Sequence, residues 1–366
     1  MSSVALFGLM SLLGVTFLFF LFFNIARKLR TVYLAGQIRE LREIVKTRIE
    51  KFVSGTEDEF NEGLEEFVRD AHKMDKNYKA MIDEYLLKGL ELPAMENRER
   101  FITIARHLDF PSDCLAQIRS KNPGISAVGS RRAGLYDLAE SVDDMVTALD
   151  LLSSENQFEI LMGLARIGGA DAMGRAFEKI KNNVIINERA VIEILSAFPD
   201  GEEKMKLFRN MFHSDMDYIT ALFLKATDRE MAKALVDDIV AVLQSGNKEI
   251  RAAAVRGLAT LEVEAPVEEL IRALEDKDWE VRALAAKALD PIVTREASGA
   301  LYKAMFDQQW WVRQNAANGL LRHPGHEALF ILAAESGDQY TRDSIISALE
   351  NGGSRLLLRA IKIMVA

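Results

Sequence analysis

Apolar side chains recur with helical spacing along most of the chain, a pattern that predicts an all-α protein. Between residues 56 and 125 the pattern divides into helices with short breaks. Thr56 is expected to begin the first of these as part of a capping box that Glu59 completes. Two further helices are expected over residues 78–90 and 98–108. Residues 56–125 are therefore predicted to form helical hairpins.

A nine-residue pattern repeats further along the chain. Its copies IRAAAVRGL (250–258), VRALAAKAL (281–289) and VRQNAANGL (312–320) are 31 residues apart, and TRDSIISAL (341–349) follows after 29 residues. Weaker copies without the arginine precede these, so the array is predicted to cover residues 126–366. A fixed period of this length is typical of stacked structural units.

Each unit is predicted to contain two helices. The first carries the repeated pattern, and the second follows a short turn, as in PVEELIRALE (266–275), where a proline stands at the helix start. One such hairpin cannot bury its own apolar face, so neighbouring hairpins must stack to complete a core. We expect small residues in the first helices to permit close packing and the second helices to line the concave surface.

These units resemble HEAT repeats, in the short form called PBS-lyase-like HEAT repeats. The resemblance rests on EDKDWEVRALAAKAL (275–289) and FDQQWWVRQNAANGL (306–320), in which an acidic turn and an aromatic residue precede Val-Arg, small residues and leucine. It covers about residues 150–366 and implies an α-solenoid. Most arrays of this kind are protein-binding scaffolds, and a minority attach bilins or modify proteins. The resemblance thus implies a scaffold, with an enzyme of the bilin-lyase-like or protein-modifying class as the alternative.

The first 23 residues contain no charged side chain. From Val4 to Phe23 they are almost purely apolar, and a helix of that length reaches across a bilayer core of about 30 Å. A cleaved secretory signal would have a basic start and small residues at its end, whereas this run has neither. Residues 1–23 are therefore predicted to be a single transmembrane anchor that precedes the solenoid.

Basic side chains follow the apolar run directly, beginning with Arg27, Lys28 and Arg30. Lysine and arginine next to a span stay on the cytoplasmic side, and they also bind anionic lipid. We therefore expect a single-pass protein of a bacterial-type inner membrane, with its N-terminus outside and its array in the cytoplasm. Residues 54–366 carry 38 basic and 52 acidic side chains, a balance that repels phosphate backbones and argues against a nucleic-acid partner.

The basic juxtamembrane segment, residues 24–55, is predicted to be a helix. Five of its apolar residues fall at heptad positions, and Arg48 interrupts the series. The five are Leu34, Ile38, Leu41, Val45 and Phe52. We favour packing of this helix on the following hairpins. The alternative is pairing with a second copy, which would make the chain a coiled-coil oligomeric tether.

Four arginines occupy equivalent positions in the repeated units. They are Arg251, Arg282, Arg313 and Arg342. We expect them to bond acidic or carbonyl groups of a neighbouring turn and so to join repeat to repeat. The acidic residues of those turns are Asp276, Asp278, Asp307 and Asp338. The other interpretation is an exposed ladder for an acidic ligand.

All three tryptophans lie where one unit turns into the next. Tryptophan and arginine contribute most of the binding energy at many protein interfaces. The candidate partner-binding residues are therefore Trp279, Trp310, Trp311, Arg282 and Arg313. Packing of the tryptophans between units is an equal alternative.

Chemical motifs do not stand out in the sequence. It has no glycine-rich phosphate loop, nucleophile elbow or metalloprotease helix. His323 and His326 flank a Pro-Gly turn without a third ligand nearby, and Cys114 has no evident histidine partner. We predict no catalytic, cofactor-binding or metal-binding residues.

The sequence as a whole predicts a membrane-anchored scaffold that is not an enzyme and that recruits protein partners to the cytoplasmic face of the membrane. Membrane-anchored proteins with short HEAT units are often associated with envelope polysaccharide glycosyltransferases or with signalling systems. A membrane glycosyltransferase or a signalling protein is therefore the expected partner. Lipid contact through the anchor and self-association complete the expected interactions.

Overall fold

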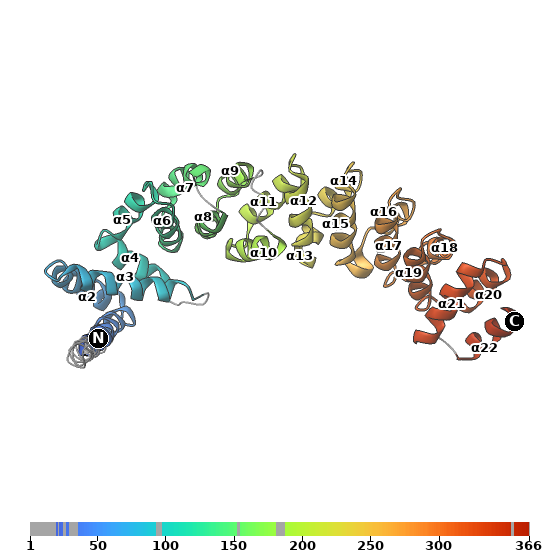
Figure 1. Cartoon of the computed structure of the whole chain (residues 1–366), viewed down its shortest axis with the longest axis horizontal. Helices are drawn as coiled ribbons and strands as arrows, with labels where there is room; N and C mark the ends of the chain where they lie inside the picture. The colour runs from blue at the N-terminus through green and yellow to red at the C-terminus, as the bar shows by residue number, and fades with distance from the viewer. Residues whose placement is uncertain are drawn as a thin grey trace, which may run out of the picture.

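The computed structural model describes residues 20, 22–24, 27–28, 36–92, 97–151, 154–180, 187–352 and 355–365. Within these residues every regular element is helical, so the all-α prediction is confirmed. The helices stack side by side into an arched α-solenoid, with α2 (Glu57–Ala71) toward one end of the arch and α22 (Arg355–Val365) at the other (Figure 1).

Two layers of helices form the arch. The inner layer contains α6 (Pro123–Leu135), α8 (Ser154–Ile167), α10 (Glu188–Ala197), α12 (Asp217–Lys225), α15 (Lys248–Ala259), α17 (Trp279–Ala288), α19 (Trp310–Leu320) and α21 (Gln339–Gly352). The outer layer contains α5 (Phe110–Ile118), α7 (Val142–Ala148), α9 (Ala170–Ile180), α11 (Glu202–Phe212), α14 (Val236–Val242), α16 (Val267–Ala273), α18 (Arg295–Ala304) and α20 (His326–Glu335). The short helix α13 (Arg229–Ala234) contacts α14 and α15 and lies toward the concave side (Figure 1). The last helix, α22 (Arg355–Val365), packs on α20 and α21.

The repeated sequence pattern lies on the inner helices. These helices line the concave side of the arch, and the outer helices lie on its convex side (Figure 1). The expectation that the second helix of each hairpin lines the concave surface is therefore wrong. Small residues explain the arrangement: Ala254, Ala285 and Ala316 are fully buried, and without bulky side chains the inner helices pack closely against one another on the tighter side of the curve.

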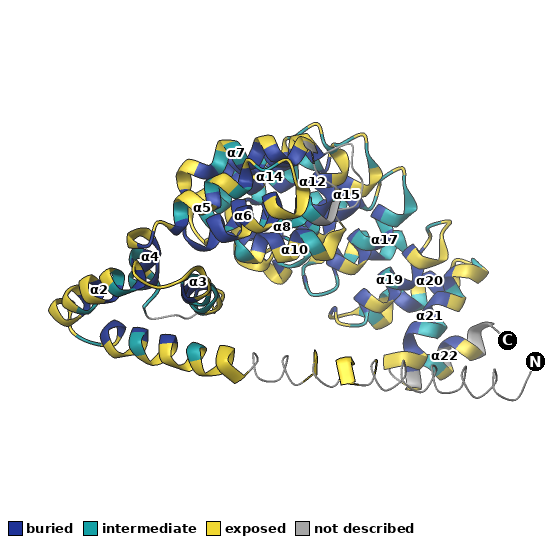
Figure 2. Ribbon diagram, turned by 60° about the vertical axis from the view of Figure 1, so that its left-hand side comes forward, coloured by how far each residue is buried: buried dark blue, intermediate teal, exposed yellow. Residues whose placement is uncertain are grey.

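The N-terminal part is built from a first helix over residues 36–53, followed by α2 (Glu57–Ala71), α3 (Lys76–Leu90) and α4 (Arg98–His107). The predicted capping box is present, since the Thr56 side chain accepts from the Glu59 N–H while the Glu59 carboxylate accepts from the Thr56 N–H. Val45 and Phe52 are buried, and the Phe52 ring lies 5.9 Å from Phe60 and 5.5 Å from Phe67. The favoured packing of the first helix on the hairpins is confirmed at these positions (Figure 2).

A buried polar network joins the N-terminal hairpins to the array. Arg132 on α6 donates to Asp83 on α3 at 2.8 Å and to Gln117 on α5 at 2.9 Å. The Tyr136 hydroxyl donates to the same Asp83 carboxylate at 2.6 Å. Because a buried charge is tolerated only when it is paired, this network fixes how α3 lies against α6.

The helices that the structure describes correct the membrane prediction. None of them combines the length and apolar composition that a bilayer crossing needs. Among the labelled helices α2 and α3 are the longest, with 15 residues each, and both carry charged side chains, whereas a span takes about 20 apolar residues. This finding contradicts the predicted single-pass location in an inner membrane. The predicted anchor, residues 4–23, lies outside the described residues except for Phe20, Phe22 and Phe23.

Helices α6 and α8 cross closely through two glycines. A Cβ added to Gly134 would lie 2.5 Å from the Gly163 backbone, and one added to Gly163 would meet the Ser130 carbonyl oxygen. The backbones therefore touch at this point, and only glycine fits on either side. A side chain at either position would push the two helices apart.

We expect Gly163→Ala to lower the free energy of unfolding by about 2 to 3 kcal/mol, because the added methyl group collides with backbone that cannot rotate away. Chemical denaturation of the full chain measures the change. The matched control is Gly299→Ala on α18, where nothing lies within 4 Å of the added carbon. It should stabilise the chain by about 0.5 to 1 kcal/mol through helix propensity. Equal effects of the two variants would contradict the tight crossing.

Candidate partner-binding edge

The N-terminal turns of α15, α17, α19 and α21 follow one another along one edge of the inner layer, here called the N-terminal edge. Contacts between consecutive turns show that they lie side by side. Lys248 of α15 forms an ion pair with Glu280 of α17 at 2.8 Å, and the Arg313 guanidinium of α19 lies 5.3 Å from the Tyr340 ring of α21. The repeated arginines and all three tryptophans lie on this edge.

Each of three arginines first binds the turn that precedes its own helix. The Nη1 atom of Arg251 donates to the carbonyl oxygens of Ser245 and Gly246 at 2.8 and 3.2 Å. Arg282 and Arg313 make the corresponding pair of bonds six and five residues upstream. These carbonyl groups would otherwise point away from any helix, so the arginines fix the turn conformation.

Two of these arginines also reach the next repeat. Nε and Nη2 of Arg251 donate to the two carboxylate oxygens of Asp276 at 2.7 and 2.9 Å, and Asp278 accepts from Nη2 at 2.6 Å. Arg282 makes the same two-bond contact with Asp307 at 2.7 and 3.0 Å. Such paired bonds match the planar guanidinium to the carboxylate. The predicted role of Arg251 and Arg282 in joining repeat to repeat is confirmed.

The pKa values of the partners follow from this geometry. Burial alone would raise the pKa of Asp276 and of Asp307. The hydrogen bonds from Arg251 and Arg282, together with backbone N–H groups of the same turns, outweigh burial and hold both pKa values below the usual range. Both carboxylates are therefore ionised throughout the neutral range, as a structural ion pair requires.

Arg313 differs from the two arginines before it. It makes no ion pair within 4.0 Å among the described residues, and its Nε is buried without a hydrogen-bond partner. Asp338, expected to bond it, instead caps α21 by accepting from the Thr341 N–H at 3.0 Å and from the Thr341 hydroxyl. These hydrogen bonds lower the pKa of Asp338. The expected Asp338 pairing with an arginine is therefore wrong.

The aromatic side chains of the edge are concentrated around α19. Trp310 is 45% exposed and Trp311 is 55% exposed, and their rings meet edge to face at 4.6 Å. Tyr340 is 66% exposed, and its ring centroid lies 5.3 Å from the Arg313 guanidinium carbon. Trp279 is half-buried. Trp310, Trp311, Tyr340 and Arg313 are together called the α19 cluster below.

The structure thus separates the predicted site residues. Arg282 is occupied by Asp307 and by the carbonyl groups of its own turn, while Trp310 and Trp311 face solvent beside Arg313. Tyr340 was not predicted as a site residue. Its position two residues before Arg342 matches that of Trp311 two residues before Arg313, and this equivalence in the sequence pattern could have identified it.

The other residues considered for chemistry have structural surroundings. Burial raises the pKa of the Cys114 thiol to about 12, so it stays protonated and is a poor nucleophile. His323 is buried, its Nδ1 lies 2.7 Å from the Ser298 hydroxyl, and desolvation lowers its pKa. His326 Nδ1 lies 3.0 Å from the His323 carbonyl oxygen. Among the described residues no group of three potential ligands could hold a metal ion.

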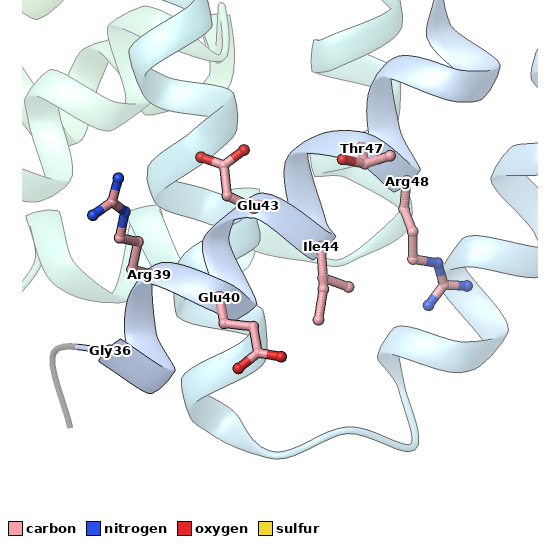
Figure 3. Close-up of a pocket in the computed structure, with 7 residues that line it drawn as sticks. All are labelled: Gly36, Arg39, Glu40, Glu43, Ile44, Thr47 and Arg48. Carbon is pink, nitrogen blue, oxygen red and sulfur yellow. The ribbon is translucent and has the colours of Figure 1, made fainter. Parts of the chain in front are cut away.

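A hollow of about 630 Å³ lies along one face of the first helix, between Gly36 and Arg48 (Figure 3). The lining residues all come from this one helix, and their side chains diverge, with Glu43 and Ile44 pointing away from each other (Figure 3). Converging groups are needed to hold a reacting atom, and this hollow does not assemble them.

Comparison with known proteins supports the repeat family. Residues 236–297, from α14 to the start of α18, match the family model for HEAT repeats. This match includes Arg251 and its partner Asp276. No curated protein was found to resemble the chain. Among solved structures, the crystal structure of an engineered protein is 18% identical and covers 70% of this chain and 97% of its own, with a TM-score of 0.29.

We expect Asp307→Ala to lower the free energy of unfolding by about 2 kcal/mol, because it leaves the half-buried Arg282 guanidinium without its carboxylate. Asp338→Ala is the matched control, since it removes an aspartate from the next turn that bonds no arginine, and it should cost about 1 kcal/mol as the loss of a helix cap. Urea unfolding of both variants measures the difference. Similar losses would show that the Arg282–Asp307 pair does not hold the repeats together.

His323 gives the array a dependence on acidic pH. Its pKa is lowered in the folded state from the ordinary 6.5, so the unfolded chain binds a proton first as the pH falls. The contribution of neutral His323 to the free energy of unfolding is complete above about pH 6.5. Below that pH it decreases, by at most about 1.4 kcal/mol per pH unit. We expect His323→Gln to flatten the decline in unfolding free energy between pH 7 and 5.5, because the variant has no imidazole to protonate. A decline that persists in His323→Gln would assign it to another group.

Proposed function

We propose that the chain is a HEAT-repeat scaffold that binds a protein partner through the α19 cluster. The observation that carries this proposal is the pair of exposed tryptophans beside Arg313. A HEAT-repeat solenoid fits a protein-interaction scaffold. The side chains at the N-terminal edge differ from one repeat to the next, so this edge can distinguish one repeat from another.

Exposure of large aromatic side chains supports this choice of surface. Exposing two adjacent tryptophans and a tyrosine to water forgoes the free energy of burying them, about 25 cal/mol per Å² of apolar surface. The equivalent positions carry the charged Lys248 and Glu249 in α15, and the half-buried Trp279 and Glu280 in α17, so the repeat does not need two aromatic residues there. The aromatic residues therefore serve no evident purpose in stacking the repeats, whereas tryptophan, tyrosine and arginine are enriched at the centres of protein interfaces.

The division of the chain follows from the same proposal. We assign residues 126–366 to the array that presents the edge and residues 56–125 to hairpins that brace its N-terminal end. A glycosyltransferase or a signalling protein remains the first class of partner to test, on the basis of the resemblance. Self-association through the first helix is the competing proposal, although Val45 and Phe52 of its heptad series are already buried within the chain.

We expect Trp311→Ala to weaken partner binding by more than about thirtyfold, the effect of an interface residue worth 2 kcal/mol, and to change the free energy of unfolding by less than about 0.5 kcal/mol. Purification of the full chain with crosslinking identifies the partner, and titration calorimetry with that partner gives the affinities. Leu332→Ala is the control, because Leu332 is a comparably exposed apolar residue on the outer helix α20. A large loss of stability in Trp311→Ala would place this side chain in the core instead.

A further inference from the structure

The four turns of the N-terminal edge share one structurally equivalent position. It lies six residues before the repeated arginine and is occupied by Ser245, Asp276, Asp307 and Ser336. Each of these side chains accepts a hydrogen bond from the backbone N–H two residues later, at 3.2, 2.8, 2.8 and 3.3 Å. The four turns can therefore be compared residue by residue.

This comparison shows why Arg313 lacks a carboxylate. Asp276 binds Arg251 and Asp307 binds Arg282, each across one repeat. The corresponding residue for Arg313 is Ser336, which has no carboxylate to offer. The spacing from Arg313 to Arg342 is 29 residues and not 31, so Asp338 falls at the cap position of α21.

The Nε side of Arg313 is the side that its two counterparts use to bind aspartate. In Arg313 the Nε atom is buried and has no hydrogen-bond partner. Its Nη1 is held by the Asp307 and Gln308 carbonyl groups, as in the other repeats, so the guanidinium is fixed in place before any ligand arrives. An unpaired buried donor is costly, and a carboxylate that pairs with it removes that cost.

The charges around Arg313 favour an acidic ligand. Helix α19 contains no acidic residue, and Gln308, Gln309 and Asn315 beside the arginine are uncharged. Hydrogen bonds from Thr341 and, to a smaller extent, the charge of Arg313 lower the pKa of Asp338, but that carboxylate forms no ion pair with the guanidinium. The Asp307 carboxylate is already bound by Arg282. The Tyr340 ring offers apolar surface directly over the guanidinium, and the exposed Trp310 and Trp311 precede Arg313 on the same helix.

We propose that the Nε side of Arg313 binds the side-chain carboxylate of an aspartate or glutamate in the partner, and that an apolar residue next to it packs on the Tyr340 ring. This inference rests on the proposed function and adds to it the chemistry of the bound segment. The partner's carboxylate takes the place that Asp276 and Asp307 occupy in the two preceding repeats. The exposed Tyr340 ring, which lies over the guanidinium, moves aside to admit it.

Restoring the missing aspartate within the chain tests this proposal. In Ser336→Asp the new carboxylate forms an ion pair with the Nε side of Arg313 within the chain. The melting temperature should therefore rise, and Arg313 should no longer bind acidic ligands. Ser336→Asn has the same shape without the charge and is the matched control. Ser245→Asp, in the equivalent turn that follows Thr220 and not an arginine, controls for added negative charge on the edge.

The probe is a library of short random peptides displayed on phage and selected against the immobilised full chain. We expect the selected peptides to share an aspartate or glutamate beside an apolar residue. Synthetic copies with an amidated C-terminus should bind Ser336→Asp at least about tenfold more weakly than the original chain and should bind the other two variants unchanged. Replacing the shared acid by its amide should weaken binding to a similar extent.

Several results would overturn the inference. Selected peptides without a shared acid, no selected peptides, or equal binding to Ser336→Asp and the original chain would each do so. Loss of binding on amidation of the C-terminus would assign the site to a terminal carboxylate, contrary to the proposal. Peptides that depend on Trp311 and not on residue 336 would leave the α19 cluster as the docking surface and remove only the carboxylate.

Discussion

Close packing between neighbouring inner helices is the constraint on which the structure depends. Each hairpin exposes an apolar face until the next one covers it, and the small residues of the repeated pattern bring the inner helices near enough to do so. That packing aligns the N-terminal turns along one edge. Only then can the side chain of Arg251 or Arg282 span from its own turn to an aspartate of the next.

The repeat period and its main interaction could be predicted from the sequence, because both are local and periodic. A spacing of 31 residues gives Arg251 and Arg282 the same surroundings, so an acidic residue 25 positions further on meets each of them. The Thr56–Glu59 capping box was predictable for the same reason, since its two partners are three residues apart. For the tryptophans the sequence left exposure and packing open.

Features that depend on distant contacts or on a change of register could not be predicted. Asp338 was assigned to an arginine because the shortened repeat moves it by two residues, and only the structure shows it as a cap. The Asp83–Arg132 pair joins residues 49 positions apart and follows no repeat. Which helix of each hairpin lines the concave side could not be predicted either, because it depends on the direction in which the whole stack of hairpins curves. The prediction of a single-pass membrane location was wrong for another reason. It rested on one apolar run, residues 4–23, most of which the structure does not describe, and no described helix could cross a membrane.

The shared backbone geometry of Ser245, Asp276, Asp307 and Ser336 bears on how such arrays diversify. The turn keeps its shape whether a serine or an aspartate occupies this position. Replacement of the aspartate by a serine therefore leaves the turn intact but removes the ion pair to the preceding unit. The arginine of that unit then becomes available to a different ligand. Duplicated units can in this way acquire separate ligands while their architecture is inherited intact.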